Sequence, residues 1–130
     1  MLITDGKYDY NSDGNQFTAT KDTTTTNDYK VTTANTYVSG GEFLYDNAEW
    51  GDYIVVEIFD KDDILPTPLT GMVKTHITKR YLHPNRDCEA LNVPYAGKVP
   101  QNCYLRIKVV STGTTNDLNC AVNYDLHKEE

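Results

Sequence analysis

The feature that most constrains the fold is a strict alternation of side chains near the end of the chain, over residues 118–126. An α-helix would spread these side chains around its axis, whereas successive side chains of a β-strand point to opposite faces. The segment therefore predicts a strand with one core face and one polar face. The core-type residues are Leu118, Cys120, Val122, Tyr124 and Leu126, and the residues between them are Asn119, Ala121, Asn123 and Asp125.

A second strand is expected over residues 104–110, where Arg106 and Lys108 alternate with apolar residues. The polar stretch Ser111–Asp117 separates it from the strand at 118–126. Two alternating segments joined by such a loop are typical of a β-hairpin, so we expect these two strands to pair.

The segment 53–59 is apolar on both faces. Ile54, Val56 and Ile58 fill one face, and the other is apolar except for Glu57. This pattern is typical of a central strand in a sandwich.

The first third of the chain is rich in threonine, with nine in residues 18–36. Threonine is β-branched and favours strands, so we expect strands at 16–20 and 29–32 around a polar turn at 22–28. Gly40-Gly41 is expected to interrupt the chain before a strand at 42–45. Residues 66–84 fit either a short helical stripe or a strand.

Seven or eight short strands, separated by Gly, Pro, Asn and Asp, predict an all-β fold. We expect an antiparallel β-sandwich of the jelly-roll type with at most one short helix. Residues 1–15 are expected to form an N-terminal arm or loop, and residues 16–130 a single sandwich domain. The expected core consists of Ile54, Val56, Ile58, Leu105, Ile107, Leu118, Val122 and Tyr124.

The formal charge of −7 argues against binding to the nucleic-acid backbone or to an anionic membrane surface. No apolar run is long enough to span a bilayer, and the first ten residues do not look like a secretory signal. Three widely spaced cysteines do not form a disulfide framework, which favours synthesis in a reducing cytoplasm.

The sequence contains no pattern typical of a catalytic site, so we expect the protein not to be an enzyme. No nucleophile–base signature surrounds the cysteines or the histidines. Cys120 lies on the core face of its strand, where a thiol is usually inert. Cys88 lies among Asp87 and Glu89, and these carboxylates are expected to raise its pKa and oppose reactivity.

Two acidic segments are candidates for calcium. Residues 9–15 place Asp9, Asn11 and Asp13 at positions 1, 3 and 5 of an EF-type loop, but Thr20 stands where the final Glu should be. A polar turn is the favoured interpretation of this segment, because Asn, Asp, Ser and Gly form turns without a metal. The second segment follows the central strand and resembles the first calcium loop of C2 domains, with solvated loop carboxylates as the alternative. Its candidate ligands are Asp60, Asp62 and Asp63.

Trp50 lies in a turn between Tyr45 and Tyr53. A tryptophan in a loop is either an anchor for a partner or a plug at the end of the sandwich. Trp50 and Tyr45 are therefore candidate interface residues.

Seven turn-and-strand segments lie along a run that covers about two thirds of the chain. They are Gly40-Gly41-Glu42, Asp46–Asp52 (DNAEWGD), Phe59–Leu65 (FDKDDIL), Tyr95–Pro100 (YAGKVP), Tyr104–Ile107 (YLRI), Ser111–Gly113 (STG) and Val122–His127 (VNYDLH). In order and spacing they resemble small virion structural proteins of tailed phages. None of the segments is an active-site motif.

The resemblance implies a particle component with a β-sandwich core. Such a protein would be a capsid decoration or cement protein that assembles through symmetric contacts, or a head–tail or tail accessory protein. Its partners would be copies of itself and other virion proteins such as the major capsid protein. It would reside in the virion after synthesis in the host cytoplasm, and the loop from Tyr95 to Pro100 would contribute contacts. A calcium-assisted binding module, for glycans, is the alternative.

Overall fold

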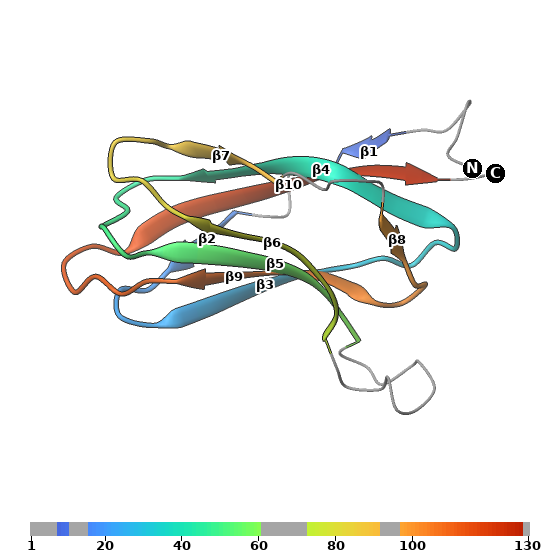
Figure 1. Cartoon of the computed structure of the whole chain (residues 1–130), viewed down its shortest axis with the longest axis horizontal. Coiled ribbons are helices and arrows are strands. Elements are labelled where there is room, and N and C mark those ends of the chain that lie inside the picture. The colour runs from blue at the N-terminus through green and yellow to red at the C-terminus, as the bar shows by residue number, and fades with distance from the viewer. Residues whose placement is uncertain (1–7, 11–15, 61–72, 92–96, 129–130) are drawn as a thin grey trace.

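The computed structural model describes residues 8–10, 16–60, 73–91 and 97–128, which form ten β-strands and no helix (Figure 1). The strands form two antiparallel sheets. The all-β prediction is therefore confirmed. No helix within these residues is long and apolar enough to cross a membrane.

The six-stranded sheet is built around two long strands, β4 (Thr36–Tyr45) and β10 (Leu118–Lys128). Two short strands, β1 (Tyr8–Tyr10) and β2 (Gln16–Ala19), pair with opposite halves of β10. In the same way, β7 (Cys88–Ala90) and β8 (Gly97–Val99) pair with opposite halves of β4, on the side away from β10. Six elements thus occupy four strand positions.

The four-stranded sheet has the order β3–β9–β5–β6. Its members are β3 (Thr24–Lys30), β9 (Tyr104–Val110), β5 (Tyr53–Phe59) and β6 (Val73–Tyr81). Figure 1 shows strands of both sheets running along the long axis of the molecule. Each connection between successive strand positions crosses from one sheet to the other, except the connection from β5 to β6. This connectivity gives two layers of four strand positions each, as in a jelly roll.

The core lies between the two sheets and agrees with the prediction from alternation. All eight predicted core residues are buried, and none exposes more than 2% of its surface. They come from β5 and β9 on one side and from β10 on the other. Removing these side chains from water is the main favourable contribution to folding.

The predicted hairpin between residues 104–110 and 118–126 is wrong, because β9 and β10 lie in different sheets. Strands that face each other across a core show the same apolar alternation as strands that pair side by side. The seven residues 111–117 are long enough to cross the roughly 10 Å between packed sheets. Alternation identified both strands but did not identify their neighbours.

The predicted break at Gly40-Gly41 is also wrong, because β4 continues through both glycines. The pairing with β10 shifts register between Asp125 and Leu126, so Ser39 is the extra residue of a β-bulge. Gly40 and Gly41 have φ values of 151° and 154°, which other residues rarely adopt. These glycines allow a bulge within a strand and do not end it.

The turn predicted at 22–28 is shorter than expected, because β3 already begins at Thr24. Asp28 was assigned to the turn, but it lies opposite Arg106 and accepts two hydrogen bonds from its guanidinium. This cross-strand pair and the threonines of β3 outweigh the turn preference of Asn and Asp.

The ambiguous stretch 66–84 contains a strand over Val73–Tyr81, and residues 66–72 lie outside the described part. β6 pairs with β5 along its whole length, with two register shifts. Pairing with a buried central strand favours the alternating pattern over the helical one.

Candidate interaction surfaces

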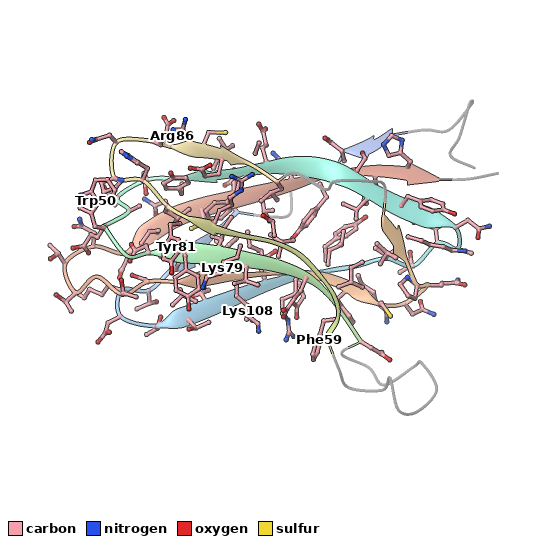
Figure 2. All side chains as sticks on the ribbon, viewed as in Figure 1. Trp50, Phe59, Lys79, Tyr81, Arg86 and Lys108 are labelled. Carbon is pink, nitrogen blue, oxygen red and sulfur yellow. The ribbon has the colours of Figure 1, made fainter. Side chains whose placement is uncertain are left out.

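The outer face of the four-stranded sheet carries cations beside aromatic rings. The inward residues of each strand fill the core, so every second side chain points outward. We call this surface the cationic face (Figure 2). Its cations are Lys30, Lys79, Arg106 and Lys108, and its rings are Tyr53, Phe59, Tyr81 and Tyr104.

Three of the four cations of this face, Lys30, Lys79 and Arg106, lie over its aromatic rings. Lys79 Nζ is 4.5 Å from the ring centre of Tyr53 and 5.3 Å from that of Tyr81. The guanidinium carbon of Arg106 is 4.0 Å from the ring centre of Phe59. Cation–π contacts of this kind contribute about 0.5–1 kcal/mol each at exposed sites. They hold long side chains in place, while Tyr81 remains 64% exposed.

A charged network lies at the centre of the cationic face. Arg106 donates two hydrogen bonds to Asp28, at 2.8 and 3.1 Å, and these bonds raise the pKa of Arg106. Lys108 Nζ lies 3.1 Å from Glu57 Oε1, although Glu57 is completely buried. Losing Lys108 would leave a buried carboxylate without this partner, so the network fixes the middle of the face.

The cationic face differs in charge from the rest of the protein. Among the described residues, its four cations and two carboxylates give it a formal charge of +2, whereas the whole chain has a formal charge of −7. A local charge opposite to the net charge is typical of a surface that meets an acidic partner.

The outer face of the six-stranded sheet has an open hollow of about 680 Å³. Leu44 and Ala121, which are cross-strand partners, give it an apolar floor, and Leu44 is 38% exposed. Asp46 and Asp87 also line it, and none of its described lining residues is a lysine or an arginine. We call this surface the acidic hollow. Asp46 accepts hydrogen bonds from both the backbone and the side chain of Asn119, at 2.9 and 3.1 Å.

Cys88 lies beside the hollow, because it is the cross-strand partner of Leu44. Partial burial and the neighbouring carboxylates of Glu42, Asp87 and Glu89 raise the pKa of its thiol. The sequence prediction for Cys88 is therefore confirmed. Burial raises the pKa of the Cys120 thiol to about 12, in agreement with its predicted place in the core.

These environments predict one slowly reacting thiol in the native protein. Ellman's reagent at pH 8 and at dilute protein concentration should modify Cys88 alone, because Cys103 and Cys120 are buried. The reaction should be slower than that of glutathione, since the raised pKa lowers the thiolate fraction. Three thiols should react in denaturant, and a Cys88→Ser variant should show none before unfolding. Rapid modification of two thiols in the native protein would contradict this assignment.

The turn after β4 presents Trp50 to solvent at the end of the molecule where several loops gather (Figures 1 and 2). Trp50 is 70% exposed, and its ring makes a T-shaped contact with the ring of His83, with ring centres 4.7 Å apart. Of the two sequence interpretations, the plug is therefore excluded. An exposed tryptophan on an ordered turn is suited to anchoring a partner.

The turn is held by the buried carboxylate of Asp52. Glu49 N donates to Asp52 Oδ2 at 2.9 Å. Asp52 Oδ1 accepts from Thr112 N at 2.8 Å, from Thr112 Oγ1 at 3.2 Å and from Gly113 N at 3.2 Å. Because Thr112 and Gly113 lie in the crossover from β9 to β10, Asp52 ties that crossover to the tryptophan turn.

Tyr45 was predicted at the interface, but it is 3% exposed and belongs to the core. Its ring stacks against Phe43, with centres 5.6 Å apart, and its hydroxyl accepts a hydrogen bond from His83 N at 3.1 Å. It faces inward because its cross-strand partner Cys120 does. Pro100 is half-buried, and Tyr95 lies outside the described residues.

The candidate calcium ligands are mostly outside the described part of the chain. Asp60 is described, directly follows β5 and is completely buried. Asp9 lies in β1, opposite Leu126, and its side chain is not described. The positions outside the described residues are Asn11, Asp13, Asp62 and Asp63. In the ranges that are described, no three His, Cys, Asp or Glu side chains form a metal-binding group. Calcium binding remains a prediction.

Neither the cationic face nor the acidic hollow could be predicted from local sequence pattern. The alternation of Lys79 with Tyr81, and of Arg106 with Lys108, was visible in the sequence. It did not show that β6 and β9 flank the same central strand, β5. Strand order brings these residues together, and the order depends on crossovers that carry no local pattern.

No protein-family model matches the sequence, and no curated protein matches it. Solved structures of infectious bursal disease virus do match the fold. The VP2 subviral particle aligns with a TM-score of 0.54 at 12% identity, over 97% of this chain and 33% of the viral chain. The structure of the Gt strain aligns with a TM-score of 0.53 at 12% identity, over 96% and 32%. T=1 particles derived from the virus align with a TM-score of 0.51 at 11% identity, over 97% and 32%.

The chain therefore spans about a third of the length of the viral chains that it matches. At this level of identity the likeness shows a shared fold. The sandwich described above is thus a fold also used by a protein of viral particles.

Proposed function

We propose that the protein is a non-enzymatic structural component of a viral particle, namely a decoration or cement protein of a tailed-phage capsid. Its partners are further copies of itself and the major capsid protein, which it meets through symmetric contacts. It is made in the host cytoplasm and resides in the virion. The observation that carries this proposal is the fold match to the particle protein VP2 over 97% of the chain.

The surfaces support assembly. Hydrogen bonds and ring contacts within the folded chain hold three surfaces in place. These surfaces are the turn with the exposed Trp50, the cationic face and the acidic hollow. Surfaces that are ordered before contact lose little conformational freedom on association. Exposed aromatic residues are also frequent anchors of protein interfaces.

The chemistry of the described residues favours a non-enzymatic role. Ser39 Oγ contacts His127 Nε2 and lies 3.4 Å from the carbonyl oxygen of Asp125. Because Ser39 is the extra residue of the bulge, these contacts tie the bulge of β4 to β10. Cys88 is exposed, but its raised pKa opposes nucleophilic chemistry.

The choice of a capsid decoration protein rests on the seven sequence segments that resemble tailed-phage virion proteins. A head–tail or tail accessory protein is the alternative within the same class. The two differ in symmetry, because a capsid lattice and a tail impose different copy numbers on their components.

Native mass tests the proposal. Light scattering on a sizing column, over a range of concentrations, should show a discrete oligomer of defined copy number. A chelator should leave that mass unchanged, because the described residues of the supporting surfaces include no group of side chains that could hold a metal ion. A monomer at every soluble concentration would contradict assembly through self-contacts. A monomer whose melting temperature falls with the chelator would instead favour the calcium-assisted glycan-binding module.

A further inference from the structure

Given that proposed function, we infer that the chain associates with itself by placing the Lys79–Tyr81 corner of its cationic face in the acidic hollow of a second copy. Lys79 and Tyr81 lie on the outward side of β6, and Leu44 lies in the floor of the hollow. In this contact, the corner of one copy occupies the hollow of the next copy.

The two surfaces lie on opposite sides of the sandwich. The cationic face covers the four-stranded sheet, and the hollow lies on the outside of the six-stranded sheet, with the core between them. One chain cannot bring its own corner to its own hollow. The contact must join two copies, and it is heterologous because different patches meet.

The apolar parts of the two surfaces match. Tyr81 exposes 64% of its surface and has a flat ring with a polar tip. The hollow has an apolar floor of Leu44 and Ala121, with the polar side chains of Gln16 and Thr18 at its side. A tyrosine ring can bury its face on such a floor while its hydroxyl reaches a polar neighbour.

The charged parts match as well. Lys79 Nζ lies over the rings of Tyr53 and Tyr81, so it would enter the contact together with the tyrosine. Asp87 is exposed, whereas Asp46 is already bonded to Asn119. Asp87 is therefore the better partner for Lys79. Complementary charges of this kind set the orientation and speed of association more than its strength.

Charge also favours a second copy as the occupant. Two copies with a net charge of −7 repel each other in most orientations. When the cationic face of one copy meets the acidic hollow of another, the local electrostatic interaction between the two copies becomes attractive. A heterologous contact repeats from copy to copy and gives a closed ring or a filament.

Charge reversal tests the contact. Lys79→Glu and Asp87→Lys should each weaken self-association about tenfold or more, because each places like charges together. The double variant should regain the association, since the pair is restored with its signs exchanged. An equimolar mixture of the two single variants should regain association, with the two variants alternating along the oligomer, because every junction between unlike copies then pairs opposite charges.

Sedimentation equilibrium measures these association constants, and Lys98→Glu is the matched control. Lys98 is an exposed cation on β8, outside both surfaces, so the control changes the charge equally and should leave association unchanged. Tyr81→Ala should also weaken association about tenfold or more, as a central anchor does. The melting temperature of every variant should stay close to that of the parent, which excludes unfolding as the cause.

The outcomes separate this contact from the proposed function. An oligomer that persists in both charge-reversal variants would overturn the contact and leave assembly standing. Failure of the double variant to regain association would also overturn it. A parent protein that stays monomeric would overturn both the contact and assembly through self-contacts.

Discussion

A Gly41→Ala substitution is expected to lower the free energy of unfolding by about 4 kcal/mol and to leave little folded protein at 37 °C. A methyl carbon at this position would lie 2.1 Å from the carbonyl oxygen of Asn123 and 3.0 Å from Cα of Tyr124. Both neighbours are backbone atoms of β10, the longest strand of the structure, so neither can move without disturbing the sheet. The φ of 154° adds backbone strain.

Gly40→Ala is the matched control for this prediction. Gly40 has nearly the same φ, 151°, but a methyl carbon there would lie 3.1 Å from the Leu91 carbonyl oxygen. Comparing the two variants by urea unfolding separates the clash from the strain. Gly40→Ala should lower the free energy of unfolding by about 1–2 kcal/mol, from the backbone strain and a milder close contact. Equal losses in the two variants would contradict the assignment of a clash to Gly41.

Asp52→Ala is expected to lower the free energy of unfolding by about 3–5 kcal/mol. The carboxylate is completely buried and accepts four hydrogen bonds from three residues, Glu49, Thr112 and Gly113. Its removal leaves three backbone amides without their acceptors. Asp52→Asn should cost about 2 kcal/mol, because one oxygen remains to accept while the new amide group faces a donor.

Glu49→Gln provides a control in the same turn. Glu49 also accepts from backbone amides, those of Thr115 and Asn116, but at 3.3 and 3.4 Å and in a partly exposed site. The Glu49→Gln substitution should lower the free energy of unfolding by less than about 1 kcal/mol. Chemical denaturation monitored by the fluorescence of Trp50 measures all three variants. A loss below 1 kcal/mol in Asp52→Ala would mean that the crossover does not depend on this carboxylate.

Local sequence pattern predicted the strands and the core well, because both depend on side chains that are near one another in the chain. The alternation of residues 118–126 directly reports which side chains face the core. The central strand at 53–59 was identified for the same reason. Cys88 and Cys120 were also placed correctly, since adjacent carboxylates and strand position determine their environments.

Pattern failed where the partner of a residue is distant in sequence. The hairpin prediction failed because a strand carries no mark of the sheet it joins. Asp52 was assigned to a turn without any sign that Thr112, sixty positions later, would donate to it. The candidate role of Lys79 and Asp87 in self-association depends on the strand order, which places their surfaces on opposite sides of the sandwich.

The cationic face and the acidic hollow lie on opposite sides of the sandwich, so their charges form an electric dipole across its thickness. Two copies with a net repulsion still turn each other head to tail as they approach, because the dipolar part of the field depends on orientation. At 0.1 M salt the field reaches about 10 Å, so this alignment acts mainly in the last moments before contact. Copies joined in this order have all their dipoles pointing the same way, and a chain of them would be polar from one end to the other.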